Sequence, residues 1–301
     1  MVYKPRTKPA ELLLYEILDT RTTLPSKEKQ QYLNLKKGYE GECIFDFLLE
    51  KLQYDCLLLN DLLLTVKGTT FQIDSVLITA EMIYLFEVKN YEGDFYYEGD
   101  TFFKKPRQEW TDPLIQLSRS ESLLRQLLHQ LGFVFPINAN VVFINKEFTL
   151  YQAPLDQPII FPTQLKRYLN KLNSTSSKLT RKHKLLADKL VALHIQNSPY
   201  TKLPSYDYDQ LHKGITCANC GSFEVHVKSR NCVCEKCGQG ELVADAVMRS
   251  VGEFRVLFPE RKVTTSGVHE WCGIVESRKR INRILEHYFK KVGQNRWIYF
   301  E

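Results

Sequence analysis

The sequence predicts an α/β protein in which one sheet-containing domain precedes a small cysteine-rich module and a helical C-terminal segment. Three observations support this fold class. Helical and strand-like apolar patterns alternate from about residue 36 to residue 196, which is typical of an α/β domain. Five of the eight cysteines fall between positions 217 and 237. Three helical patterns and a short hairpin pattern then close the chain. The length of 301 residues favours about two domains.

The composition excludes several classes of protein. With 44% hydrophobic and 25% charged residues, the chain is neither wholly disordered nor a simple fibre. No run approaches the ~20 apolar residues of a membrane helix, and charges in residues 1–16 argue against a secretory signal, so we expect a cytoplasmic protein without membrane contact. The net charge is +6, and residues 165–189 hold eight basic side chains against one acid. This stripe either follows a phosphate backbone or is a solvated helix face.

The first regular pattern of the main domain is a helix that begins near residue 38. Residues 1–35 form an N-terminal extension with one predicted helix and no functional signal. In the following helix, Gly41 falls at the centre of the apolar stripe and Glu42 on its rim. A glycine there allows the helix to approach a sheet closely, and a carboxylate on the rim can face along the sheet. Glu40 is the competing acid, but it lies farther from the stripe and is expected to face solvent.

The elements that follow alternate between strands and helices. Two strands at 71–78 and 83–89 are joined by a short connection, and an aromatic-rich hairpin follows them. Asp112-Pro113 has the pattern of a helix N-cap followed by proline at the first helical position. The remaining predicted elements are a helix to about residue 131, strands at 140–145 and 159–161, and helices at 163–172 and 178–196.

Three charged residues on the two neighbouring strands predict a metal site. Glu87 and Lys89 point to the same face of their strand, and Asp74 lies on the paired strand. Two neighbouring carboxylates at the end of an apolar run are costly to bury without a cation. Mg²⁺ prefers such ligands, and a water bound to it attacks a phosphodiester more readily. The alternative is an Asp–Lys–Glu ion-pair cluster on an edge strand.

The order of the motifs resembles the nuclease-related domain (NERD) family, a branch of the PD-(D/E)xK restriction-endonuclease-like fold. The resemblance covers roughly residues 35–170 and implies a mixed sheet flanked by helices with a metal-dependent phosphodiesterase site. The usual Asn-Pro pair of the family is replaced here by Asp-Pro, which concerns helix capping more than chemistry. The motifs are Gly38-x-x-Gly41-Glu42, Gln72-Ile73-Asp74, Glu87-Val88-Lys89-Asn90 and Asp112-Pro113-x-x-Gln116.

The resemblance assigns a catalytic role to five residues. Glu42 matches the acid of the helix, and Asp74 and Glu87 match the two acids that bind Mg²⁺ or Mn²⁺. Lys89 matches the catalytic lysine, which can orient water and offset charge in the transition state. Gln116 matches a glutamine that contacts the lysine, the water or a phosphate. We therefore expect a nuclease-like domain over residues 36–197.

The cysteine spacing predicts a zinc ribbon over residues 214–242, after a linker at 198–213. Cys217 and Cys220 form one Cys-x-x-Cys-Gly knuckle, and Cys234 and Cys237 form the second. Four thiolates at this spacing suit tetrahedral Zn²⁺ in a structural role. Cys232 is a spare cysteine that could replace one ligand, although we expect it to be a strand residue. The alternative is a set of redox-active or reduced thiols.

Residues 243–301 resemble a winged helix-turn-helix in the order of their elements. The pattern predicts helices at 244–258, 265–272 and 276–289 and a hairpin at 290–300. The third helix would enter the major groove of DNA, while basic residues of the hairpin would contact the backbone. The expected nucleic-acid-binding residues are Arg278, Lys279, Arg280, Asn282, Arg283, Lys290, Lys291 and Arg296. The alternative is a helical domain that binds proteins.

These features together predict a Mg²⁺-dependent nuclease that hydrolyses DNA and is targeted by the zinc ribbon and the winged helix. The alternative function is a non-catalytic DNA-binding regulator or scaffold, in which the nuclease-like fold only grips the phosphate backbone. Nucleic acid, expected to be DNA, is the main partner, and a homodimer or a protein partner stays open.

Overall fold

The computed structural model describes residues 1–174, 178–196 and 204–301, and it divides the chain into two compact units. The sheet unit comprises Met1–Lys8 and Leu33–Thr201, and the C-terminal unit comprises Pro9–Tyr32 and Lys202–Glu301. The predicted N-terminal extension, residues 1–35, is thus divided between the two units.

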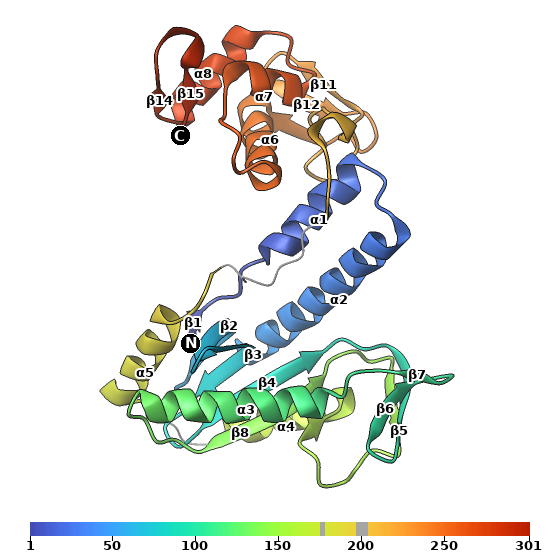
Figure 1. Cartoon of the computed structure of the whole chain (residues 1–301), viewed down its shortest axis with the longest axis vertical. Coiled ribbons are helices and arrows are strands. Elements are labelled where there is room, and N and C mark those ends of the chain that lie inside the picture. The colour runs from blue at the N-terminus through green and yellow to red at the C-terminus, as the bar shows by residue number, and fades with distance from the viewer. Residues whose placement is uncertain (175–177, 197–203) are drawn as a thin grey trace. The chain divides into compact units, whose positions relative to one another are not determined.

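The sheet unit is built on a six-stranded mixed sheet with the order β1-β2-β3-β4-β8-β10 (Figure 1). Strands β2, β3 and β4 pair antiparallel, whereas β1, β8 and β10 each pair parallel with a neighbour. This arrangement confirms the predicted α/β class with a mixed sheet. The strand bounds are β1 Val2–Lys4, β2 Leu57–Val66, β3 Thr69–Ile78, β4 Ile83–Lys89, β8 Ile137–Phe143 and β10 Ile159–Ile160.

Helices cover both faces of this sheet. On one face, Phe45 of α2 (Ser26–Leu49) and Leu165 of α4 (Leu165–Asn173) share an apolar cluster with Phe86 of β4. On the other face, α3 (Pro113–Gln130) and α5 (Arg181–Ala192) pack in the larger cluster that holds Leu57 and Leu85. The basic stripe of residues 165–189 is therefore split between opposite faces, because α4 and α5 lie on different sides of the sheet.

A second sheet extends the unit beyond the carboxyl ends of β4 and β8. Its order is β7-β6-β5-β9, and the antiparallel pair β5–β6 is the predicted aromatic-rich hairpin. Strands β7 and β9 complete it, and a 3-10 turn, η1, precedes α4. The bounds are β5 Gly93–Glu98, β6 Thr101–Lys104, β7 Gln108–Glu109, β9 Phe148–Tyr151 and η1 Pro162–Gln164.

The C-terminal unit packs α1 (Ala10–Arg21) against α6 (Val243–Leu257) around the fully buried Trp271. The guanidinium of Arg21 lies 4.1 Å from the Trp271 ring. A three-stranded antiparallel sheet and three helices followed by a hairpin appear in the predicted order. The further bounds are η2 Tyr208–Gln210, β11 Val225–Lys228, β12 Asn231–Cys234, β13 Gly240–Leu242, α7 Thr265–Cys272, α8 Arg278–Tyr288, β14 Lys291–Val292, η3 Asn295–Trp297 and β15 Tyr299–Phe300.

The predicted linker, residues 198–213, is packed rather than free over its described part, residues 204–213. Residues 198–203 lie outside the described residues. From residue 204 onward the segment packs into the C-terminal unit, where Tyr208 and Leu211 are buried and the Tyr206 hydroxyl donates to the Leu257 carbonyl. Burial of these apolar side chains outweighs the polar character that suggested a linker.

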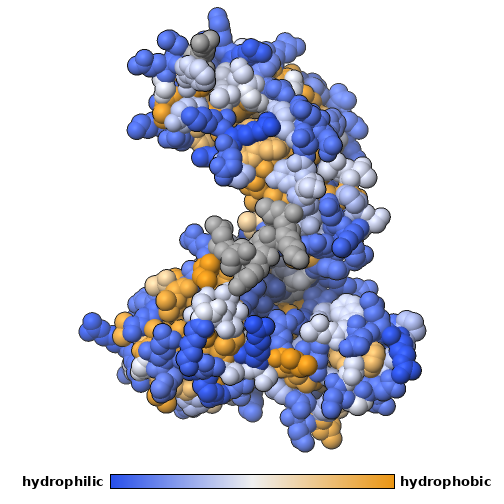
Figure 2. Space-filling model, in the orientation of Figure 1, coloured by the Kyte–Doolittle hydropathy of each residue, from blue (hydrophilic) through white to orange (hydrophobic). Residues whose placement is uncertain are grey.

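No helix among the described residues combines the length and the apolar character that crossing a membrane requires. The face in view in Figure 2 is mainly hydrophilic, with hydrophobic residues scattered between charged ones.

Candidate catalytic site and cysteine cluster

Strands β3 and β4 bring Asp74 and Glu87 together in the interior of the sheet unit. The ladder between these strands ends at the pair Ser75–Phe86. Beyond this pair, the Val88 N–H donates to Oδ2 of Asp74 at 2.7 Å. Asp74 is 7% exposed and Glu87 only 1%, so both carboxyl groups are withdrawn from water.

Lys89 links the strand carboxylate to helix α3. Its Nζ lies 2.7 Å from Oε1 of Glu87 and donates to Oε1 of Gln116 at 3.0 Å. Gln116 is placed by the predicted cap, since the Asp112 side chain accepts from the Leu114 N–H. Glu87 Oε2 is different, because it is buried and has no hydrogen-bond partner among the described residues.

Glu42 lies on α2 and is held by Arg6, a residue of the N-terminal segment for which the sequence predicts no role. Its Oε2 accepts from Nη1 of Arg6 at 2.6 Å, and Arg6 also pairs with Asp46 at 2.8 Å. Residues 1–35 were expected to carry no functional signal. Arg6 lies in this range, and its contacts span 36 to 69 positions of chain and leave no local pattern. Glu40 is exposed, as expected.

Gly41 provides the predicted close approach of α2 to the sheet. A Cβ at this position would lie 2.5 Å from Cβ of Asn90, the residue after Lys89. Asn90 itself donates to the Lys37 carbonyl of α2 at 2.7 Å. The glycine thus sets the distance between the helix that carries Glu42 and the end of β4.

The electrostatics of the site follow from burial. Burial, and secondly the charge of Asp74, raise the pKa of Glu87 to about 8 and that of Glu42 to about 8. Burial acts to lower the pKa of Lys89, but the neighbouring carboxylate of Glu87 overcomes this effect and the pKa is raised. Ionising Asp74, Glu87 and Glu42 together is therefore costly, whereas Lys89 remains a cation. An additional cation would favour the ionised carboxylates.

The donor set fits a hard divalent cation held by two carboxylates. Glu87 Oε2 is an orphaned buried acceptor beside the Asp74 carboxylate, and Mg²⁺ binds through one or two carboxylates while keeping several waters. Glu42, Asp74 and Glu87 do not form a tight ligand cage. Among the described residues, only the four cysteines bring three or more ligand atoms within 4.8 Å of one another.

The four predicted zinc ligands do come together. The sulfur atoms of Cys217, Cys220, Cys234 and Cys237 lie within 4.8 Å of one another, with separations of 3.5 and 3.7 Å for two pairs. Zn–S bonds of about 2.3 Å give a tetrahedron with edges of about 3.8 Å, so the cluster is consistent with a structural zinc site. Cys232 is buried in β12 and is not part of the cluster.

The glycines after the two knuckles have the backbone conformation that the turn requires. The φ angles of Gly221 and Gly238 are +70° and +74°, in the left-handed region that glycine tolerates best. The Asn219 N–H points to the Cys217 sulfur at 3.4 Å. Between the knuckles, β11 and β12 form the predicted hairpin.

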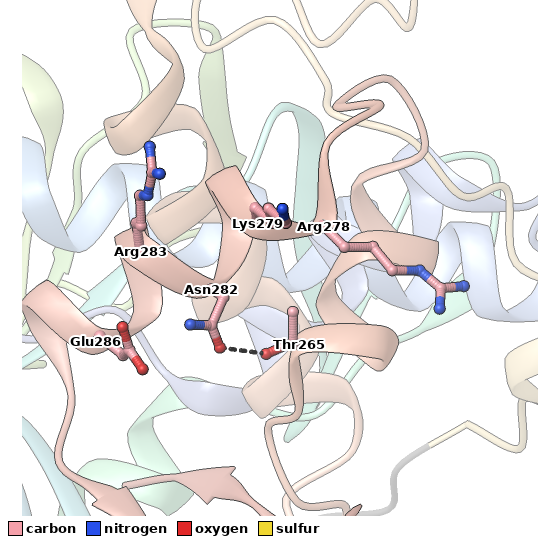
Figure 3. A pocket seen from close by; sticks show the side chains of 6 residues that line it. All are labelled: Thr265, Arg278, Lys279, Asn282, Arg283 and Glu286. Carbon is pink, nitrogen blue, oxygen red and sulfur yellow. Dashed lines mark hydrogen bonds between the residues drawn. The ribbon is translucent and has the colours of Figure 1, made fainter.

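Part of the predicted nucleic-acid-binding set lines one pocket of about 420 Å³ on α8 (Figure 3). The pocket is lined by Thr265, Arg278, Lys279, Asn282, Arg283 and Glu286. The Asn282 amide oxygen accepts from the Thr265 hydroxyl, which holds it against α7. The side chains of Arg278, Lys279 and Arg283 are exposed, and no ion pair of theirs occurs within the described part of the chain.

The other predicted contact residues lie outside this pocket. Arg280 is half-buried and donates to the Ser229 carbonyl, and Lys291 pairs with Glu286 at 2.9 Å. Lys290 is exposed at the start of the hairpin. The side chain of Arg296 lies outside the described residues.

Comparison with known proteins found one family that matches part of the chain. Residues 37–144 match the family model of the nuclease-related domain, NERD. Searches among curated proteins and among solved structures gave no match. The matched range contains all five predicted catalytic residues, whereas Arg6 and the cysteine cluster lie outside it. The chain therefore contains a nuclease-related domain, in agreement with the order of its motifs.

Proposed function

We propose that this protein is a Mg²⁺-dependent nuclease that hydrolyses phosphodiester bonds of DNA. The observation that carries the proposal is the orphaned Oε2 of Glu87, which is buried beside Asp74 within reach of a fixed lysine. A buried carboxylate oxygen without a partner is unfavourable unless the group takes up a proton or a cation binds it. The match to a nuclease-related domain supports the same conclusion.

Each residue of the site has a distinct task in this proposal. Asp74 and Glu87 would hold the ion, which would make a bound water more acidic and offset negative charge on the phosphate. Lys89 presents a permanent positive charge to the attacked phosphate, because the neighbouring carboxylates keep its pKa raised. Gln116 fixes the Lys89 ammonium from α3 through the 3.0 Å hydrogen bond.

The C-terminal unit would deliver the nuclease to nucleic acid. Arg278, Lys279 and Arg283 are three exposed cations on the first two turns of α8, and Coulomb attraction to phosphates supplies much of the affinity of such surfaces. The zinc site stabilises the small sheet that precedes α6, since a segment with so few apolar residues depends on a metal to fold.

One observation favours the second candidate, a non-catalytic nucleic-acid-binding scaffold. Lys89 already lies 2.7 Å from Glu87, and Arg6 already pairs with Glu42, so two of the three site acids have a cationic partner without a metal. In that case the sheet unit would bind phosphates without cutting them.

A cleavage experiment separates the two candidates. Zinc-loaded full-length protein is incubated with circular DNA, linear DNA and RNA in Mg²⁺, in Mn²⁺ and in EDTA, beside Asp74→Asn and Lys89→Gln. The matched control is Glu92→Gln, which removes an exposed acid of the same unit. We expect metal-dependent cutting of DNA by the wild type and the control only. Binding of all substrates without cutting by the wild type would favour the scaffold.

A further inference from the structure

The sheet is irregular at the position of Asp74. Strands β2 and β3 pair Asn60 with Ser75 and next Leu62 with Ile73, so the pair between them is absent from the ladder without a shift of register. The residue opposite Asp74 is Asp61, whose φ of +53° is incompatible with a regular strand. On the β4 side, pairing also ends at Ser75. Asp74 therefore lies at a point where the ladder is interrupted on both sides.

Two basic side chains of the N-terminal segment occupy this interruption. Lys4 Nζ donates to the Asn60 and Asp61 carbonyls at 2.7 and 2.9 Å. Arg6 Nη2 donates to the Asp74 carbonyl at 2.7 Å. These side chains satisfy carbonyl groups that a regular ladder would have satisfied, as buried backbone acceptors require.

The Arg6 guanidinium also ties this point to helix α2. Nε and Nη2 bind the two carboxylate oxygens of Asp46 at 2.8 and 3.1 Å, and Nη1 binds Glu42 at 2.6 Å. The Arg6 side chain is 4% exposed. A planar fork that makes a bidentate pair fixes direction as well as distance. The same guanidinium thus connects the helix acid to the backbone of the strand acid.

We propose that Arg6 is a positioning residue of the metal site, which fixes the backbone of Asp74 and the side chain of Glu42 so that the strand carboxylates can hold the ion. This inference rests on the proposed function. Asp74 is then held from two directions, by Arg6 at its carbonyl and by the Val88 N–H at Oδ2. Residues that orient metal ligands typically change metal affinity 10- to 100-fold when they are replaced.

The competing explanation is that Arg6 only neutralises buried acids and has no effect on the metal. Arg6→Lys separates the two, because lysine keeps the positive charge but has no planar fork to bind Asp46, Glu42 and the Asp74 carbonyl together. A purely neutralising role predicts unchanged metal affinity in Arg6→Lys.

The test is direct Mn²⁺ binding to zinc-loaded full-length protein, measured from the loss of the free Mn²⁺ electron paramagnetic resonance signal. The matched control is Arg21→Lys. Arg21 is an equally buried arginine of the C-terminal unit that pairs with Glu253 and donates to the carbonyls of His212 and Gly214. We expect Arg6→Lys to bind Mn²⁺ at least tenfold more weakly than the wild type, and Arg21→Lys to bind it equally well.

The outcomes distinguish this inference from the function on which it rests. Wild-type affinity in a folded Arg6→Lys protein overturns the role of Arg6 alone. If the wild type does not bind Mn²⁺, or if Asp74→Asn still binds it, the metal site itself is overturned. If Arg6→Lys does not fold, Asp46→Asn weakens two of the guanidinium contacts, and unchanged Mn²⁺ affinity in that variant overturns the inference as well.

Discussion

Replacing Gly41 by alanine tests how closely α2 must approach β4. The new Cβ would lie 2.5 Å from Cβ of Asn90, whereas carbon atoms in contact lie about 3.5–4.0 Å apart. The helix or the strand end must move by about 1 Å, and such overpacking typically costs about 1–3 kcal/mol. Alanine also recovers about 0.5–1 kcal/mol in a helix interior. The net expectation is a loss of stability of about 0–2.5 kcal/mol.

Gly38 on the same helix is the matched control. A Cβ there meets no atom within 4 Å, so Gly38→Ala should stabilise the unit by the helix term alone, about 0.5–1 kcal/mol. The two variants should therefore differ by about 1–3 kcal/mol, which corresponds to roughly 2–12 °C in Tm for a domain of about 150–250 residues. Thermal unfolding of both variants at equal zinc content measures this difference. A Gly41→Ala protein as stable as Gly38→Ala would refute the close-approach argument.

Three further predictions concern the acids, the zinc site and α8. Burial raises the pKa of Glu87 to about 8, above the ~4.3 of an unfolded glutamate. This residue should therefore lower the free energy of unfolding of the metal-free protein progressively as pH rises from about 4.3 through 8. Urea unfolding of Glu87→Gln should show a weaker dependence of that free energy on pH, and an unchanged dependence would argue against a buried acid. Metal analysis should find well under one zinc per chain in Cys237→Ser and a full complement in Cys232→Ala, whereas loss in both would make Cys232 a ligand. The double variant Arg278→Gln/Arg283→Gln should reduce the slope of log affinity for DNA against log salt by about 2, and an equal slope would exclude α8 from the phosphate contacts.

Local patterns predicted the parts of the protein in which the interacting residues are close in sequence. The Asp112-Pro113 cap, the apolar run that ends in Glu87 and Lys89, and the two cysteine knuckles all depend on spacings of a few residues. The observed helix start and cysteine cluster agree with those spacings. Gly41 was identified because it falls at the centre of an apolar stripe, which is also a local signal.

Features that depend on distant contacts were not predictable in this way. Strand β2 was missed because Asn60 and Asp61 interrupt its apolar run, and Asp61 turns out to mark the irregularity opposite Asp74. Arg6 was missed because its partners lie on α2 and β3, far along the chain. The packing of residues 204–213 into the C-terminal unit likewise depends on burial of Tyr208, which composition alone does not reveal.

In the proposed function, Asp74, Glu87 and Lys89 form a metal-dependent site that cuts DNA. The most direct measurement is single-turnover cleavage of a preformed protein–DNA complex, started by adding Mg²⁺ and compared with Asp74→Asn and Lys89→Gln at matched binding. We predict that the wild type forms product as soon as Mg²⁺ is mixed in. We predict that the cleavage rate of both variants is lower by at least about a hundredfold. Cleavage without added metal, or at the wild-type rate in either variant, would contradict this assignment of the site.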